Sequence, residues 1–360
     1  MIAVGIVVGT ALGLWMTSSN NTSGFNVLSV DTLLFFLLWA IMATFLHELG
    51  HMLFGFVSGY KFVYFKLFGT IIFKKDNKWQ TARDGKKGVI GQCIMRPDFE
   101  YHDKMPYLLY NAGGCIVNFV FAVLCFVLIF AYGQNPFAIA GVVVNVIFAI
   151  MNILPAKSMV NDGYNMKNIG ITNDNKRAYW LELNITADIL HGKTFSEMPS
   201  HYFDFEATDL HLDNVCASLY MKYCHLVCTW QMQKATDLIT WLYENRAKMP
   251  LSNANTFCVE YFNHVMLFEE NTPKAIGIFN EFTPPIKNAI QRVPVPFAIV
   301  AKILANAISA HNDVQFNLDC MVMQKIIDVS KNLAETEYNN ILFRQAKRIY
   351  GEVNDSPFDI

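Results

Sequence analysis

The chain has 360 residues, of which 53% are hydrophobic and 16% are charged, and its formal net charge is −2. This length predicts roughly two to three domains, and a charge so close to zero gives no basis for nucleic-acid binding. The charges are unevenly distributed, because no Lys or Arg precedes Lys61. The first half is therefore typical of a membrane protein, whereas the second half is typical of a soluble helical domain.

Residues 1–17 are apolar and just long enough to span a bilayer, so they are predicted to form a first transmembrane helix. A cleaved signal peptide would need a basic start and a small-residue cleavage site, and neither is clear in this segment. A polar, uncharged link at 18–30 leads to a second predicted span at about 31–57.

The second span carries the motif His-Glu-Leu-Gly-His at 47–51, in its last third. His47 and His51 are four residues apart, so they share one face of a helix and can bind one Zn²⁺ together. Glu48 follows His47 and can reach a water molecule on the metal. The alternative is a buried polar patch that binds a neighbouring helix, but ionisable groups inside a span are costly and by default functional.

Residues 60–73 alternate aromatic and β-branched side chains, and they are too short and too strand-like for a helical span. Together with a second candidate strand at 88–95, they predict a β-hairpin or small sheet inserted at about 60–97. Strands at a membrane surface must satisfy their edges, and one way is to accept an extended peptide as an additional strand. We therefore expect the 60–73 region to present substrate through an exposed edge.

Two further spans are predicted at 106–132 and 136–155. The third span contains Asn118 among its few polar residues, and the fourth contains Asn152 near its end. Asp162 follows shortly afterwards. A carboxylate so close to a membrane helix needs a partner, and a metal ion is one such partner.

The basic residues predict how the spans are oriented. The loop 58–104 holds ten Lys or Arg residues, whereas the other two predicted links between spans hold none. Positive charge favours the cytoplasmic side, so this loop and everything after the fourth span are placed in the cytoplasm. His47, His51 and Asp162 would then lie at one depth. The interpretation is a multi-pass protein of a bacterial cell membrane with a cytoplasmic C-terminal domain.

These motifs resemble the core of the site-2-protease-type intramembrane zinc metalloproteases, the M50 peptidase family. The matching segments are His-Glu-Leu-Gly-His at 47–51, Gly-Cys-Ile-Val-Asn at 114–118, Asn-Ile-Leu-Pro at 152–155 and Asn-Asp-Gly at 161–163. The match covers about 31–166. Two positions depart from the family pattern: Cys115 replaces a Pro, and Asn161 replaces a Leu. Neither position is a metal ligand or the acid–base residue of the family.

The resemblance implies a zinc site with three protein ligands and a fourth position for water. The implied ligands are His47, His51 and Asp162. Glu48 would take a proton from the water and pass it to the leaving amine. Asn152 and Asn118 would hydrogen-bond the substrate backbone or the developing oxyanion. For each Asn, a hydrogen bond between helices is an equally good interpretation.

From about residue 170 the composition changes, and amphipathic patterns predict helices. They lie at about 176–191, 208–231, 233–247, 254–269, 273–282, 296–311, 314–334 and 336–350. Paired helices of this length suggest a tetratricopeptide-like array, although no clean period of about 34 residues emerges. Such arrays present binding surfaces, so 170–360 is predicted to bind substrate, a cytoplasmic regulator or a second copy of the chain. The eight cysteines show no framework spacing and are predicted to be reduced core residues.

The predicted fold is a mainly α membrane protein, with about four transmembrane helices and a short membrane-associated β element at 1–169. A cytoplasmic helical domain follows at 170–360. The predicted activity is zinc-dependent cleavage of a peptide bond within or near a transmembrane segment of a membrane-tethered substrate. The alternative is a non-catalytic membrane scaffold whose helical domain binds cytoplasmic partners, but a scaffold has no use for Glu48. A metal transporter would need ionisable residues along a pathway rather than at one end.

Overall fold

The computed structural model describes residues 30–75, 78–83, 90–133, 135–156, 160–309 and 312–351. The chain divides into two compact units, residues 1–176 and 177–360. The predicted first span, at 1–17, lies outside the described residues. Three helices within the described part are long and apolar enough to cross a membrane, namely α2 (Val30–Val57), α3 (Tyr107–Tyr132) and α4 (Pro136–Ile153). They confirm the helices predicted at 31–57, 106–132 and 136–155.

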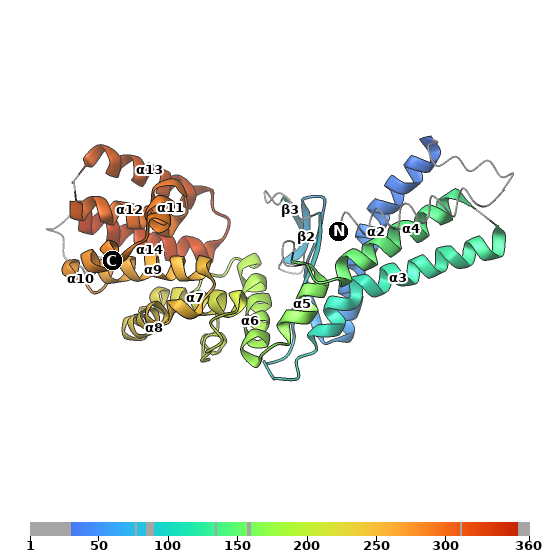
Figure 1. Cartoon of the computed structure of the whole chain (residues 1–360), viewed down its shortest axis with the longest axis horizontal. Coiled ribbons are helices and arrows are strands. Elements are labelled where there is room, and N and C mark those ends of the chain that lie inside the picture. The colour runs from blue at the N-terminus through green and yellow to red at the C-terminus, as the bar shows by residue number, and fades with distance from the viewer. Residues whose placement is uncertain are drawn as a thin grey trace. The chain divides into compact units, whose positions relative to one another are not determined.

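The three apolar helices α2, α3 and α4 pack side by side (Figure 1). Their shared core contains Trp39, Ala43 and Val144, and the Trp39 indole N–H donates to the Phe137 carbonyl over 2.8 Å. Large apolar side chains also cover the outside of these helices; Phe130, for example, is 88% exposed. An apolar exterior on helices of this length is typical of contact with lipid.

The β element is a four-stranded antiparallel sheet in the order β3-β2-β1-β4. Its strands are β1 (Tyr60–Leu67), β2 (Thr70–Lys75), β3 (Lys78–Arg83) and β4 (Gly91–Pro97). Phe68 and Gly69 connect β1 to β2 with φ values of 47° and 77°. Positive φ at both positions of a two-residue hairpin loop matches the right-handed twist of the strands.

The expectation that 60–73 has an exposed edge is wrong for 64–67 and 70–73, which have strands on both sides. β1 pairs with β4 on one side and with β2 on the other, and β2 pairs with both β1 and β3. The pairing between β1 and β2 joins 64–67 to 70–73, so these residues lie between two strands, whereas 60–62 pair with β4 alone. Within the described residues the edge strands are β3 and β4. Of these two, β4 contacts α2.

The second unit is helical. Its elements are α6 (Asn173–Leu190), which begins in the first unit, α7 (Asp213–Cys228), α8 (Met232–Glu244), α9 (Leu251–Leu267), α10 (Thr272–Glu281), α11 (Pro284–Arg292), α12 (Pro296–Ser309), α13 (Asp313–Val329) and α14 (Leu333–Gly351). Every helix that the sequence predicts after residue 170 is present. α11 was not predicted, because its two initial prolines indicate a boundary, yet proline is well tolerated in the first helical turn.

The cysteines and the bent pair α11–α12 bear on the predicted soluble, reduced character of this protein's helical part. All eight cysteines are free. Seven of them are buried, which confirms these seven as core residues, whereas Cys320 is half-buried. α11 and α12 are together apolar enough for a span, but they are bent by 104°. α11 packs against α12, and α12 also contacts α9, α13 and α14 of the second unit.

Candidate metal centre

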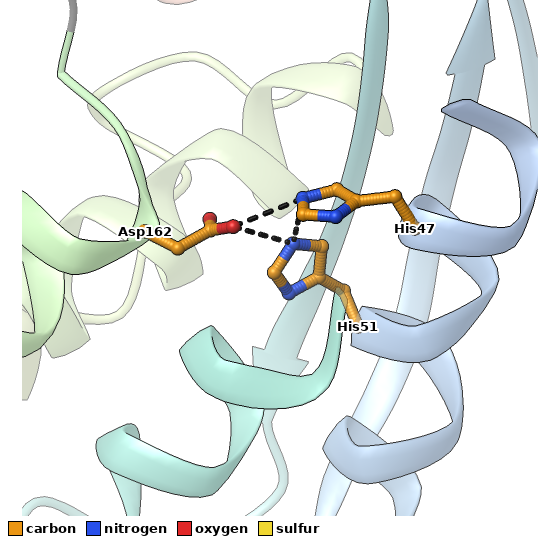
Figure 2. A group of neighbouring side chains, drawn as sticks. All are labelled: His47, His51 and Asp162. Atoms are coloured by element: carbon orange, nitrogen blue, oxygen red, sulfur yellow. Dashed lines mark hydrogen bonds and ion pairs between the residues drawn. The ribbon is translucent and has the colours of Figure 1, made fainter. Parts of the chain in front are cut away.

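Three side chains from two distant segments meet at one point (Figure 2). His47 and His51 come from successive turns of α2, and Asp162 is the first residue of α5 (Asp162–Ile169). Asp162 Oδ2 lies 2.9 Å from His47 Nε2 and 3.3 Å from His51 Nε2, and the two ring nitrogens are 3.2 Å apart. These side chains thus form a group that can hold a metal ion, and no other such group occurs among the described residues.

The spacing of the three atoms fits an ion in a tetrahedral site. Metal–ligand bonds of about 2.0 Å place neighbouring ligand atoms about 3.3 Å apart. The three separations in this group, 2.9, 3.2 and 3.3 Å, lie close to that value. Two imidazoles and a carboxylate are also a common ligand set for catalytic zinc.

The other nitrogen of each histidine ring is held by an oxygen. His47 Nδ1 lies 2.8 Å from Asn118 Oδ1, and His51 Nδ1 lies 2.9 Å from the Tyr110 carbonyl oxygen. Because both oxygens can only accept, both Nδ1 atoms carry the hydrogen and donate. Each Nε2 then keeps its lone pair for a cation, which is the usual arrangement of metal-binding histidines.

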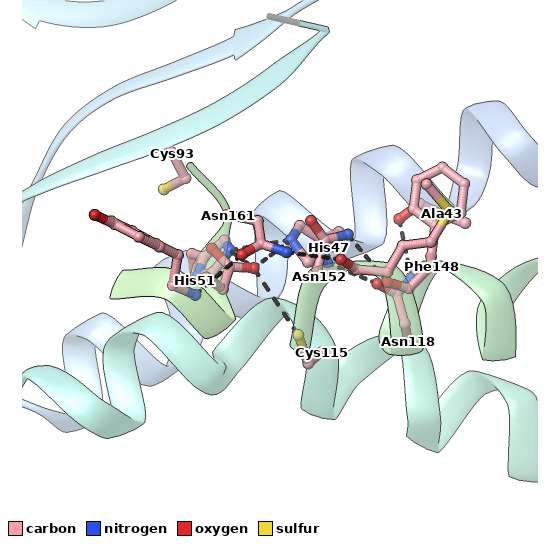
Figure 3. Close-up of polar contacts among 12 residues, drawn as sticks. Ala43, His47, His51, Cys93, Cys115, Asn118, Phe148, Asn152 and Asn161 are labelled. Atoms are coloured by element: carbon pink, nitrogen blue, oxygen red, sulfur yellow. Dashed lines mark hydrogen bonds and ion pairs between the residues drawn. The ribbon is translucent and has the colours of Figure 1, made fainter. Parts of the chain in front are cut away.

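Close contact between α2 and α3 places the His47 ring. A Cβ atom at Gly114 would lie 2.5 Å from His47 Cε1, so any side chain there would displace the ring. The next residue, Cys115, is buried, and its thiol donates to Asp162 Oδ2 over 3.9 Å (Figure 3). The Gly-Cys pair at 114–115 therefore touches a ligand from each of the two segments.

Asn161 holds the start of α5 against the end of α4. Its amide nitrogen donates to the carbonyls of Met151 and Leu154, each over 2.7 Å, and its oxygen accepts from the Tyr164 N–H. The oxygen thereby caps the N-terminus of α5. The departure from the family's Leu at position 161 thus supplies hydrogen bonds that fix the residue next to Asp162.

Gly163 allows α5 to begin this close to α4. A Cβ atom at this position would lie 2.0 Å from the Ile153 carbonyl oxygen. The Asp162 side chain is consequently only 16% exposed, and it lies against the His51 and His47 rings. An ionised carboxylate at this place is the form that binds a cation.

Glu48 is buried on α2 and faces the edge strand β4. The Cys93 backbone N–H donates to its carboxylate. A Cβ atom at Gly91 would lie 2.7 Å from Glu48 Oε1, so β4 and this carboxylate are in direct contact. The general base predicted from the motif is thus held between the metal-binding helix and the sheet.

The two asparagines predicted to bind substrate lie in different surroundings. Asn118 is fully buried, and its amide bonds to His47, the Ala43 carbonyl and Asn145. This is the position of a group that orients His47. Asn152 is half-buried in the last turns of α4, where its amide nitrogen donates to the Phe148 carbonyl over 3.0 Å. Its role toward substrate stays a prediction.

Sequence reasoning did not identify Asn145, and it noted Asn161 only as a departure from the family pattern. Asn145 precedes Asn152 by seven residues on α4, and two helical turns bring both residues to one face. The sequence feature that could have indicated Asn145 was a polar amide inside an apolar span. For Asn161, the signal was a good N-capping residue directly before an Asp.

Comparisons of the chain with protein-family models, with curated proteins and with solved structures found no match. The resemblance to the M50 family therefore rests on the motifs and on the arrangement of their residues.

Proposed function

We propose that this chain is an intramembrane zinc-dependent endopeptidase, similar to the M50 family, that cleaves membrane-tethered substrates within or near a transmembrane segment. The proposal is carried by one combination: a triad that can bind a metal, with Glu48 beside it, on a helix apolar enough to cross a membrane. A membrane scaffold would explain the triad and the helices, but it would leave the buried Glu48 without a role.

In the proposed mechanism His47, His51 and Asp162 hold the metal. When bound, Zn²⁺ supplies Lewis acidity toward the scissile carbonyl and makes a water molecule more acidic. Glu48 accepts the proton of the attacking water at a carboxylate oxygen and then donates it to the leaving amine nitrogen. The Cys93 N–H fixes the direction of the carboxylate. Charge development thus takes place in a buried site, where positioned groups act most strongly.

The substrate must become extended before cleavage, because a helix hides its carbonyls in its own hydrogen bonds. We propose that β4 guides the extended segment, in place of the 60–73 region. β4 is an edge strand, and Gly91 and Cys93 on it touch Glu48. Strand addition at an edge is a common way to bind an extended peptide.

The contact between β4 and Glu48 makes a specific prediction. Gly91→Ala would place a methyl group 2.7 Å from Glu48 Oε1, so the carboxylate must move. Because a misplacement of about 1 Å can cost on the order of 10²-fold in rate, we expect a loss of that size in turnover. Metal content should not change, since the atoms nearest to the Gly91 methyl belong to Glu48 and Thr44 rather than to a metal-binding residue. Single-turnover cleavage and metal analysis of the same samples measure both quantities.

Gly277→Ala is the matched control, because a Cβ atom at this glycine in α10 meets nothing within 4 Å. It should leave turnover unchanged. Wild-type turnover in Gly91→Ala would mean that Glu48 is not held against β4 during the reaction. Loss of metal in Gly91→Ala would mean that the strand supports the ligands rather than the base.

We propose that the helical unit at 177–360 binds the cytoplasmic part of a substrate, a cytoplasmic regulator or a second copy of the chain. The support is a groove of ≈ 900 Å³ between α7, α8 and the segment 200–208. It is lined by aromatic, acidic and basic side chains, including Trp241, Asp237 and Lys222. Concave sites of this size suit ligands and peptide side chains. The excess of basic residues in 58–104 supports a cytoplasmic location.

The proposed function is tested with purified protein in detergent and a synthetic transmembrane peptide. We expect about one bound Zn²⁺ per chain and new peptide ends detected by mass spectrometry. A strong chelator should abolish cleavage, and Zn²⁺ in stoichiometric amount should restore it, because the ligands must be occupied for activity. Bound zinc without cleavage of any membrane peptide would favour the scaffold. Cleavage that persists in metal-free protein would refute the metalloprotease.

A further inference from the structure

A chain of amide groups links the metal-binding helix to both other apolar helices. Asn118 on α3 bonds to His47 on α2, over 2.8 Å, and its amide nitrogen donates to Asn145 Oδ1 on α4, over 3.0 Å. The same nitrogen donates to the Ala43 carbonyl over 3.1 Å (Figure 3). Asn145 in turn donates to the Gly141 carbonyl over 2.8 Å. Both asparagines are fully buried, so water does not compete for these bonds.

The partners determine which way each amide points. Asn145 has the Gly141 carbonyl on one side, which can only accept, so the Asn145 nitrogen must face it. Asn145 Oδ1 is thereby turned toward Asn118. Asn118 then faces two acceptors at one end, Asn145 Oδ1 and the Ala43 carbonyl, and must place its nitrogen there. Its oxygen is left facing His47.

The orientation of Asn118 decides where His47 carries its hydrogen. An amide oxygen opposite Nδ1 requires a hydrogen on Nδ1, so Nε2 is the nitrogen whose lone pair is available to a metal held between it and Asp162. A reversed Asn118 amide would present its N–H to Nδ1 instead. His47 would then carry its hydrogen on Nε2, and this tautomer cannot bind a metal through Nε2.

We propose that Asn145 is a positioning residue for metal binding, which keeps His47 in its metal-binding tautomer by preventing reversal of the Asn118 amide. Asn145 is not one of the proposed metal ligands, and it acts on His47 through Asn118. Reversal in the native chain breaks two hydrogen bonds and sets the Asn118 oxygen against two other oxygens. Without the Asn145 amide, one of the two hydrogen bonds that oppose reversal of Asn118 is lost. The inference rests on the proposed metal site, but the tautomer can be measured without metal.

Asn145→Leu tests this role, because leucine has a similar shape and no polar group. We expect Zn²⁺ affinity, measured in the full chain by competition with a chromophoric chelator, to fall by about tenfold or more, as is typical when an outer-shell partner is removed. Trp39→Phe is the matched control. It removes another buried hydrogen bond between α2 and α4 but lies outside the amide chain. Trp39→Phe should keep wild-type affinity even if both variants lose similar thermal stability.

A double variant separates positioning from packing. Asn118→Asp has an acceptor at both ends, so it can present only an oxygen to His47, whichever way it turns. In this background Asn145→Leu should no longer reduce Zn²⁺ affinity. A purely structural role of Asn145 predicts the same loss in both backgrounds. The double-mutant cycle therefore distinguishes the two explanations.

Ring ¹⁵N chemical shifts of His47 in metal-free protein report the tautomer directly, and His47→Gln assigns the signal. We expect Nδ1 to carry a hydrogen in the wild type, and a measurable population in Asn145→Leu in which Nδ1 has lost its hydrogen and accepts from the reversed Asn118 amide. Unchanged shifts together with unchanged Zn²⁺ affinity would overturn the inference. A wild-type protein that binds no zinc would refute the proposed function, while these shifts would still decide the role of Asn145.

Discussion

Glu48→Gln is expected to keep its metal and to lose cleavage. Glutamine has the shape of glutamate but cannot accept a proton, so the proposed general base is removed while the fold is preserved. General acid–base groups typically accelerate a reaction by about 10²–10⁴-fold. We therefore expect turnover of a transmembrane peptide to fall by about 10²-fold or more. His47, His51 and Asp162 are unchanged, so zinc content should equal that of the wild type. Mass spectrometry of the peptide and metal analysis of the same preparation measure both quantities.

Glu100→Gln is the matched control for this substitution. Glu100 is exposed on the loop after β4, so the same chemical change there should alter neither quantity. Retained cleavage in Glu48→Gln would remove Glu48 from the mechanism. Loss of both zinc and cleavage would show instead that Glu48 supports the ligands. The inactive, metal-containing protein would also serve to trap substrates, since peptides that accumulate with Glu48→Gln in membranes are those the wild type cleaves.

The apolar helices and the metal triad could be predicted because each depends on a local pattern. An apolar run of membrane length specifies a span whatever its neighbours are. The spacing of His47 and His51 brings them to one side of any helix. Asp162 was harder to predict as part of the triad, since it lies in a different segment from the two histidines. The link was that both segments end near the same predicted side of the membrane. The structure brings the three side chains together as expected.

The pairing of the strands could not be predicted from local pattern. Alternation of residues identified 60–73 as strand, but it does not show which strands lie on each side. That depends on β3 and β4, and β3 (Lys78–Arg83) is too polar to be recognised as a strand. With both neighbours in place, 64–67 of β1 and 70–73 of β2 have strands on both sides.

The supporting amides were missed for a related reason. Asn145 and Asn161 act through the groups opposite them, which are the Asn118 amide for one and the Met151 and Leu154 carbonyls for the other. A hydrogen bond between helices depends on their rotation and distance, which the sequence of one helix does not contain. Sequence reasoning can therefore find the ligands of such a site more readily than the residues that orient them.

Asp162→Ala is expected to have the largest effect on the metal itself. Asp162 Oδ2 contacts both histidine nitrogens, and it is the only ligand in the group that comes from outside α2. Its removal leaves two imidazoles from one helix. We expect Zn²⁺ affinity to fall by more than the roughly 10–100-fold that loss of an outer-shell partner costs. Because a bound ion stabilises the folded state by mass action, the rise in melting temperature on adding Zn²⁺ should also disappear.

The choice of control decides what the Asp162 experiment means. Asp98→Ala removes an exposed carboxylate that pairs with Lys61, away from the triad, and should retain both the zinc and the thermal shift. Asp162→Asn keeps the shape of the side chain but loses the charge, so it should bind zinc more weakly than the wild type and more tightly than Asp162→Ala. Full zinc occupancy in Asp162→Ala, together with occupancy in His47→Ala, would place the metal elsewhere. Glu48 would then no longer stand beside the metal, and the proposed protease would lose its water-activating site.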